Sequence, residues 1–303
     1  ETLVLSNSGT VSNANVGTDK AVTIGSLSLG NGSNGGLSSN YTLSGGTHTL
    51  SVTKRPVTIS GTRVYDGTAT VSNSSINTFN NRAGSETLSL TGSGSLGSAA
   101  VGSGKAITLG TLALADNTGL ASNYSLSSGT FDVTVKNVSF VGSRVYDGTT
   151  SVNSSNISST FTGLAGGETL TLSGSGSVAS KNVASGQSVT IGSIAIANGT
   201  GVASNYSLTS ATLDITQRPI SLSGTRVYDA TTTASSSDLT TFTNLVGSET
   251  LVLSNSGTVS NANVGTDKTV TIGSLSLGNG SNGGLSSNYT LSGGTHTLNV
   301  TKR

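Results

Sequence analysis

The sequence contains no cysteine, methionine or tryptophan, and only 2 of its 303 residues are proline. The absence of cysteine excludes disulfide bonds, thiolate catalysis and cysteine-ligated zinc sites. Charged residues make up 9% of the chain, against roughly 25% in an average globular protein, and the net charge is +1. Because such a chain has no strongly basic surface, neither nucleic acid nor an anionic membrane is expected as a partner.

Long apolar runs are also absent. No run approaches the roughly 20 residues that span a bilayer, so membrane insertion of this segment is not expected. No signal-peptide pattern opens the chain at Glu1. We therefore expect a fragment whose targeting signals lie elsewhere.

Catalytic and metal-binding groups are scarce. The 2 histidines, His48 and His296, occupy the same repeat position, and each is expected on the surface of a terminal strand. Residues 56–217 contain no histidine, so their many serines lack the base that activates a nucleophile. The 13 acidic residues are scattered and form no Asp-x-Asp-x-Asp-Gly calcium loop. The sequence therefore predicts no enzyme, no catalytic residue, no metal site and no cofactor.

Glycine is abundant, with 42 residues, and serine, threonine and asparagine fill much of the remainder. Disordered linkers share this composition. Here, however, valine, isoleucine and leucine alternate with polar residues, as in residues 168–172 and 189–191. A period of two is typical of half-buried β-strands. The sequence thus predicts several small β cores.

The chain is built from tandem repeats. An Arg-Val-Tyr-Asp-Gly motif at residues 63–67 returns at 144–148 and, with Ala230 in place of glycine, at 226–230. Segment 1–55 matches segment 249–303 at all but two positions, which indicates recent duplication. The predicted units are the truncated C-terminal part of a repeat at 1–55 and complete repeats at 56–136, 137–217 and 218–303.

The units follow one another without a Gly/Ser linker, and a proline stiffens two of the joints, at Pro56 and Pro219. We predict an all-β fold in which small β-sandwich-like domains of about 82 residues form an extended rod. A parallel β-helix or β-grasp-like units are the alternatives. In the second complete unit, residues 138–141 and 144–146 are expected to pair as two strands, and 153–164 to be a non-strand insert.

The recurring charged and aromatic residues are the candidate site. The landmarks of the repeats are Arg63, Tyr65, Asp66, Arg144, Tyr146, Asp147, Arg226, Tyr228, Asp229, Tyr41, Tyr124, Tyr206 and Tyr289. The motif tyrosine is expected to fill the core of its own unit, because each unit needs a large anchor. The alternative is a sugar-stacking platform. The motif arginine and aspartate are expected to form a local ion pair or turn cap, with a ligand clamp as the alternative.

Asn-x-Ser/Thr sequons are frequent. Candidate glycosylation sites are Asn31, Asn73, Asn153 and Asn198. The asparagines of the Ser-Asn-Tyr sequences, such as Asn123, also lie in sequons. Their side chains could instead hydrogen-bond to the backbone in a turn.

These motifs resemble the YDG/MBG-type glycine-rich repeats of filamentous-haemagglutinin-like adhesins, which are exported by two-partner secretion. The resemblance rests on the Val-Tyr-Asp-Gly motif, the Glu-Thr-Leu strand start at Glu168, residues 182–191, residues 204–208 and the terminal 214–219. It implies a location outside the cell, at the bacterial surface or outer membrane. It also implies a role in attachment or biofilm cohesion.

Three functions are compatible with these observations. The first is an adhesin stalk that projects a distal binding region and whose repeats contact neighbouring repeats of the same chain. The second is direct binding of extracellular polysaccharide, or of a host-cell glycan or protein, by the repeat faces. The third is an ice-binding surface. Irregular placement of threonine and serine disfavours it, because ice binding requires a regular, flat array.

Overall fold

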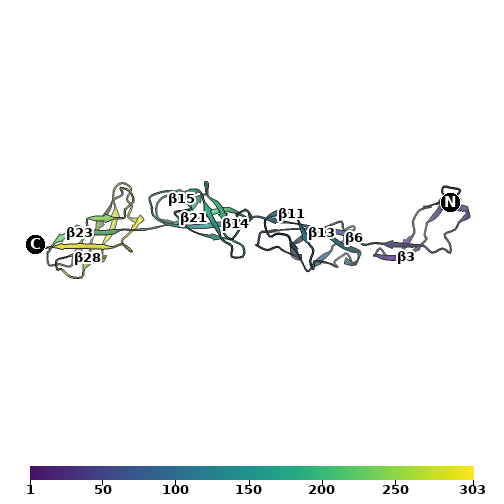
Figure 1. The fold of residues 1–303 in the computed structure, drawn as a ribbon, viewed down its shortest axis with the longest axis horizontal. Coiled ribbons are helices and arrows are strands. Elements are labelled where there is room, and N and C mark those ends of the chain that lie inside the picture. Colours follow the sequence, from purple (N-terminus) through teal and green to yellow (C-terminus); the bar gives the residue numbers. More distant parts are fainter. The chain divides into compact units, whose positions relative to one another are not determined.

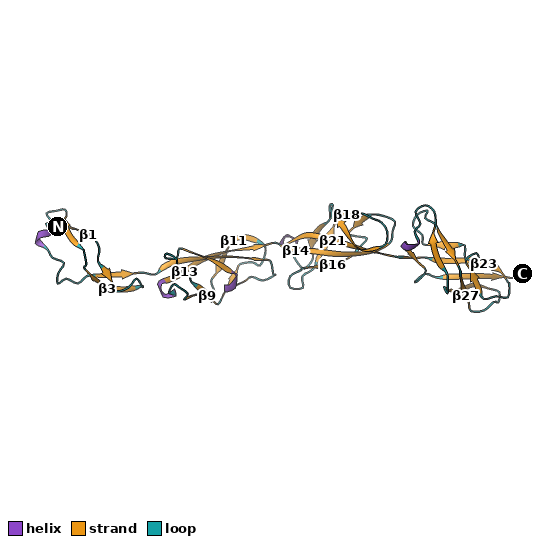
Figure 2. Ribbon diagram, turned by 180° about the vertical axis from the view of Figure 1, so that it is seen from behind, coloured by secondary structure: helices purple, strands orange, loops and turns teal.

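The computed structural model describes residues 1–303, almost entirely as strands joined by turns (Figure 1). Its helices, drawn purple in Figure 2, are 3-10 turns of three residues. They are η1 Ser38–Asn40, η2 Asn73–Ser75, η3 Ala121–Asn123, η4 Ala203–Asn205 and η5 Ser286–Asn288. None of the helices is long and apolar enough to cross a membrane. The chain divides into two compact units, Glu1–Thr134 and Val135–Arg303.

The repeat that occupies residues 136–216 has eight strands. They are β14 Lys136–Val145, β15 Ser151–Asn153, β16 Ser158–Thr162, β17 Leu170–Ser173, β18 Ser175–Val178, β19 Ala184–Thr190, β20 Ala195–Asn198 and β21 Tyr206–Thr216. Six of them form one sheet in the order β15-β18-β19-β21-β14-β16, and β17 pairs with β20. The first and last strands, β14 and β21, are neighbours and run parallel, whereas the other pairs are antiparallel.

The other two complete repeats have the same order of strands. Residues 55–134 contain β6 Arg55–Val64, β7 Thr70–Ser72, β8 Ile76–Asn80, β9 Ser89–Thr91, β10 Ser93–Leu96, β11 Gly102–Thr108, β12 Ala113–Ala115 and β13 Tyr124–Thr134. Residues 218–301 contain β22 Arg218–Pro219, β23 Ser221–Val227, β24 Thr233–Ser235, β25 Thr241–Thr243, β26 Leu251–Ser254, β27 Ser256–Val259, β28 Gly265–Thr271, β29 Ser276–Asn279, β30 Tyr289–Thr290 and β31 His296–Thr301. Their central parallel pairs are β6–β13 and β23–β31.

Segment 1–54 forms only part of a repeat. Its strands are β1 Leu3–Ser6, β2 Thr10–Val11, β3 Gly17–Thr23, β4 Ser28–Asn31 and β5 Thr49–Val52. They form the pair β1–β4 and the three-stranded sheet β2-β3-β5. No strand in this segment corresponds to β14, so β5 lacks the parallel neighbour that β21 has.

Alternation of residues places the core on one face of each six-stranded sheet. In β14, Val138 and Phe140 are buried, and Phe140 is paired with the buried Ala211 of the parallel neighbour β21. Leu213 and Ile215, further along β21, are buried as well. The side chains between them point outward and are mostly small and polar, as the period of two requires. The tandem all-β prediction is therefore confirmed, and the antiparallel pairs exclude the coils of a parallel β-helix.

Two local predictions are wrong. Residues 138–141 and 144–146 do not pair with each other, because β14 runs through both as one strand up to Val145. The predicted non-strand insert at 153–164 contains a strand, β16, which pairs with β14 at the edge of the sheet. Its sequence Ser-Ser-Thr-Phe-Thr has one large apolar residue, so its hydrophobic signal is weak, and hydrogen bonding to β14 determines its conformation.

Candidate functional site

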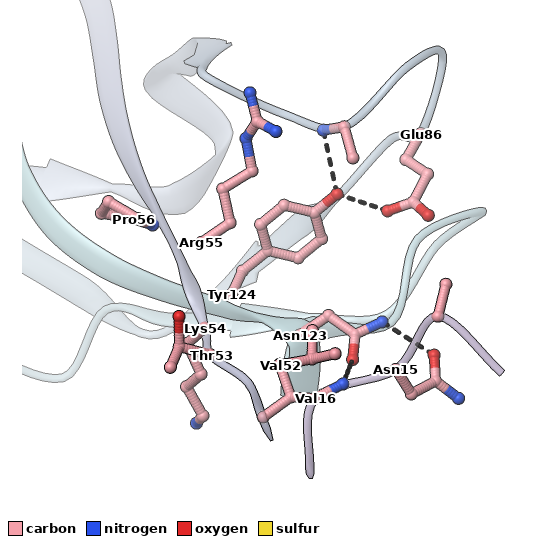
Figure 3. A pocket seen from close by; sticks show the side chains of 12 residues that line it. Asn15, Val16, Val52, Thr53, Lys54, Arg55, Pro56, Glu86, Asn123 and Tyr124 are labelled. Carbon is pink, nitrogen blue, oxygen red and sulfur yellow. Dashed lines mark hydrogen bonds between the residues drawn. The ribbon is translucent and has the colours of Figure 1, made fainter. Parts of the chain in front are cut away.

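Within each compact unit, the asparagine of a Ser-Asn-Tyr sequence joins two successive repeats. Asn288 is fully buried, and its Oδ1 accepts a hydrogen bond of 2.9 Å from the backbone N–H of Val183 in the preceding repeat. Its Nδ2 donates to Asn182 Oδ1 at 3.0 Å. In the other unit, Asn123 makes the same two bonds to Val16 and Asn15, each 2.9 Å long (Figure 3). The sequon at these positions is thus part of a joint between repeats.

A lysine holds the loop that meets this asparagine. In segment 1–54, Lys20 Nζ donates to the backbone oxygens of Asn13 and Asn15, at 2.7 and 2.6 Å. Lys268 does the same to its own loop, and Gln187 takes the position in the middle repeat, where its Nε2 donates to Asn182 O at 3.0 Å. Hydrogen bonds from its own repeat therefore hold the loop that the asparagine of the next repeat contacts.

The tyrosine of each Ser-Asn-Tyr sequence binds the glutamate of the Glu-Thr-Leu sequence in the same repeat. Tyr289 Oη donates to Glu249 Oε2 at 2.7 Å and accepts from Val246 N at 3.0 Å. Tyr206 binds Glu168 at 2.5 Å. Tyr124 binds Glu86, as Figure 3 shows, and Tyr41 binds Glu1. Two landmarks that are far apart in the sequence thus form one structural pair.

In the unit Val135–Arg303, the motif tyrosine of one repeat joins this pair in the next. Tyr146 is fully buried, and its Oη donates to Glu249 Oε1 at 2.8 Å. Its ring meets that of Tyr289 edge to face, with centroids 5.5 Å apart. Lys181 Nζ lies 3.1 Å from Glu249 Oε1. We call Tyr146, Lys181, Glu249 and Tyr289 the junction cluster.

The junction cluster stabilises the ionised form of its carboxylate. Burial disfavours the charge of Glu249, but hydrogen bonds from Tyr289, Tyr146 and Lys181 outweigh this effect and hold its pKa below the ordinary value. Burial and then the bond to Glu249 raise the pKa of Tyr146. The bond to Glu249 likewise raises the pKa of Lys181. Each member therefore keeps the protonation state that its neighbours require at neutral pH.

A lowered carboxylate pKa makes the junction acid-sensitive. The ionised carboxylate of Glu249 contributes fully to stability above its unfolded-state pKa of about 4.3. This contribution is lost as the pH falls through the lower folded-state pKa. We expect Glu249→Gln to cost roughly 1–3 kcal/mol at neutral pH, because buried donors lose a charged acceptor, and the cost to shrink in acid. Urea unfolding from about pH 3 to 7 measures it. Glu1→Gln, at an exposed pair, is the control, and a cost that does not vary with pH would contradict the assignment.

The expectation that the motif tyrosine fills the core of its own unit needs correction. Tyr146 packs against Tyr289 and Glu249 of the following repeat. Tyr65 is also buried, but Tyr228 is 38% exposed, and no later repeat in residues 1–303 covers it. Sequence spacing gives the position of a tyrosine within a repeat, but it does not tell which of two adjacent repeats its ring enters.

In the unit Glu1–Thr134, a cavity lies at the place that corresponds to the junction cluster. It has a volume of about 490 Å³ and lies beside Glu86 and Tyr124, against Ala14 and Val16 of segment 1–54 (Figure 3). Glu86 there occupies the position of Glu249. In the unit Val135–Arg303, the ring and hydroxyl of Tyr146 lie beside the corresponding tyrosine and carboxylate.

The motif arginine and aspartate are arranged as an ion pair within a turn. Arg144 lies 3.3 Å from Asp147 and donates to the backbone oxygens of Thr149 and Ser151. Asp147 Oδ1 accepts from the backbone N–H of Thr149 at 3.0 Å. The pairs Arg63–Asp66 and Arg226–Asp229 lie at 3.4 and 3.5 Å and make the same bonds. The guanidinium groups are directed at backbone atoms within the repeat, which leaves them few donors for a ligand.

The histidine expected on the surface is buried in the last repeat. His296 is 4% exposed, its Nδ1 accepts from Leu222 N at 3.2 Å, and its Nε2 donates to Leu291 O at 2.8 Å. His296, Leu298 and Val300 occupy every second position of β31 and so lie on the same face of the strand. This period of two is the sequence signal that could have predicted the burial of His296. No three histidine, aspartate or glutamate side chains gather where they could hold a metal ion.

The candidate glycosylation sites differ in how their amides are used. Asn31 and Asn198 are exposed, and their Oδ1 atoms accept from the backbone N–H of Ser38 and Ala203 at 2.8 and 2.7 Å. These bonds leave Nδ2 without a role in the turn. Asn73 donates its Nδ2 to Leu90 O at 2.9 Å, and Asn153 is half-buried. Asn31 and Asn198 are therefore the two candidates that are exposed and whose Nδ2 makes no hydrogen bond within the repeat.

Comparison with protein families accounts for the repeats. The YDG domain model matches three times in tandem, at residues 49–131, 132–213 and 214–297. No curated protein and no solved structure gives a significant match. The three matches cover most of the chain, so the chain belongs to the YDG domain family and is a tandem array of its repeats.

Proposed function

We propose that this chain is the stalk of a bacterial cell-surface adhesin, in which it projects a distal binding region and supports attachment or biofilm cohesion. The observation that carries the proposal is the joint between repeats. Asn288 is completely buried and hydrogen-bonded to the preceding repeat, and the junction cluster adds an ion pair between the same two repeats. The most regularly placed side chains of the sequence thus serve to connect repeats.

The composition supports the rest of the proposal. A chain without cysteine is held together by non-covalent interactions alone, so its stability does not depend on disulfide bonds or on the redox state of its surroundings. This property suits a secreted, non-enzymatic protein at the cell surface. Low charge and small polar side chains give the faces of the repeats little tendency to associate laterally. Its partners are then the neighbouring repeats, and a separate tip binds the receptor.

The stalk proposal predicts an extended chain in solution. Repeats of about 35–40 Å joined end to end reach roughly 140–150 Å, which corresponds to a radius of gyration of about 40 Å. A compact globule of this chain length would give about 19 Å. Small-angle X-ray scattering distinguishes the two, and a radius near 20 Å would contradict the proposal.

A glycan array with proteins of one, two and three repeats tests where binding occurs. We expect no glycan to bind at any repeat number, because a stalk leaves binding to a separate tip and each added repeat buries the motif tyrosine that it covers, as Tyr146 is buried. Binding that increases with repeat number would assign recognition of polysaccharide or host glycan to the repeats themselves and would overturn the stalk as their sole function.

A further inference from the structure

The two ends of each complete repeat leave from neighbouring parallel strands. In the middle repeat, β14 and β21 pair from Lys136 with Tyr206 to Val145 with Thr216, with one shift of register. Because the strands are parallel, the start of β14 and the end of β21 lie at opposite ends of this pair. Tension applied to the chain therefore pulls the two strands past each other along their axes. Residues 146–205 connect the two strands in the sequence and do not carry the force.

We propose that this terminal strand pair, β14–β21 and its counterparts, is a mechanical element that lets each repeat resist tension along the chain. When force runs along two paired strands, it loads all their hydrogen bonds together, so that they must break almost at once. When force pulls two strands apart from one end, the bonds break one after another. Because the first and last strands of each complete repeat are parallel, tension on the chain loads their hydrogen bonds together.

The position of the pair within the sheet strengthens it. β21 is covered on its outer edge by β19, and β14 by β16, so neither strand of the pair is an edge strand. Val138 and Phe140 of β14 and Ala211, Leu213 and Ile215 of β21 are all buried. Water therefore has restricted access to the backbone bonds that the force loads, and competing water is what replaces a strained hydrogen bond.

Side chains add bonds across the same line. The ladder shifts register between Val138 and Ser139, and there Thr209 Oγ1 donates to Val138 O at 3.3 Å. At the far end Thr216 Oγ1 donates to Arg144 O at 3.3 Å, and the backbone N–H of Tyr146 donates to Thr216 O at 2.9 Å. Additional hydrogen bonds thus connect the two strands at the bulge and at the C-terminal end of the pair.

The last repeat has a weaker version of this element. β23 and β31 pair only from Leu222 with His296 to Val227 with Thr301, and a turn around Gly293 separates this ladder from the short pair β22–β30. Fewer bonds are therefore loaded together. The structure provides its own comparison between a long and an interrupted terminal strand pair.

Single-molecule pulling between paired cysteines tests the inference directly, because the chain has no cysteine of its own. The variant Val135→Cys/Gln217→Cys pulls β14 and β21 along their axes. The variant Val135→Cys/Ser204→Cys pulls the same strands apart from one end. These positions are exposed and lie outside the two strands. We expect the first direction to require at least about twofold more force at equal loading rate, since forced unfolding is governed by the unfolding barrier.

A third variant, Gln217→Cys/Lys302→Cys, applies the axial pull to the last repeat, and we expect an intermediate force. Equal forces in the two directions through the middle repeat would overturn the inference. The inference rests on the proposed stalk for its biological setting only. A weak terminal strand pair in a chain that scatters as an extended rod would contradict the mechanical role and leave the stalk proposal intact. A strong pair in a compact chain would contradict the stalk proposal and leave the mechanical property of the repeat intact.

Discussion

Tyr146→Ala is expected to lower the free energy of unfolding of the unit Val135–Arg303 by roughly 3–5 kcal/mol, the usual effect of deleting a fully buried aromatic side chain. The ring contacts Tyr289 and the hydroxyl binds Glu249, both in the following repeat. The loss should therefore reach residues 218–301 as well as the repeat that contains Tyr146. Denaturant unfolding gives the size of the effect, and amide hydrogen exchange shows which repeat it reaches.

Tyr228→Ala is the matched control, because Tyr228 occupies the same position of the motif but is 38% exposed. It should cost less than about 1 kcal/mol, as surface substitutions generally do. Tyr146→Phe separates the ring from the hydroxyl, since it keeps the packing and removes only the bond to Glu249. If Tyr146→Ala and Tyr228→Ala were equally destabilising, the motif tyrosine would belong to the core of its own repeat after all.

Gly224→Ala is expected to destabilise the last repeat by about 3 kcal/mol or more, through a backbone clash that rotamer changes cannot relieve. A Cβ at Gly224 would lie 1.7 Å from the backbone oxygen of Asp238. Either β23 or the loop at Asp238 must then move, and β23 is one strand of the terminal strand pair. Thermal unfolding followed by circular dichroism would measure the loss.

The equivalent glycine of the middle repeat provides the control. A Cβ at Gly142 would meet the side-chain ends of Ile157 and Leu213 at 3.2 and 3.3 Å, which can shift by a few tenths of an ångström. Gly142→Ala should therefore cost less than about 1 kcal/mol. A similar loss at both positions would show that glycine is needed there for a reason other than the approach of Asp238.

The sequence predicts the repeats and their β-structure well, because both follow from local information. Alternation of apolar and polar residues marked β17 and the end of β19 directly. The parallel pairing of β14 with β21 was not predictable in the same way. A period of two identifies the buried face of a strand but carries no information about which strand becomes its neighbour, and here the partners are about 70 residues apart.

The candidate site, too, was only partly predictable: the sequence shows the recurring residues but not their partners. Tyr289 was among the predicted landmarks, and Glu249 begins a recurring Glu-Thr-Leu sequence, but only the fold shows that the two side chains bind each other. Lys181 was missed because it has no counterpart in the other repeats, where Ala14, Ala99 and Ala262 occupy its position. A search for regularity cannot find a residue that occurs once, although its proximity to a buried carboxylate gives it an evident role.

The joint between repeats also has a genetic consequence. Each complete repeat carries both a Ser-Asn-Tyr sequence, which receives the preceding repeat, and a Val-Tyr-Asp sequence, whose tyrosine in the middle repeat enters the following one. Recombination between stretches as similar as 1–55 and 249–303 inserts or deletes whole repeats in frame. Because the interaction is between nearest neighbours, a repeat gained in this way would bring its own residues for both sides of such a joint. We therefore expect the number of repeats to change without the evolution of a new interface.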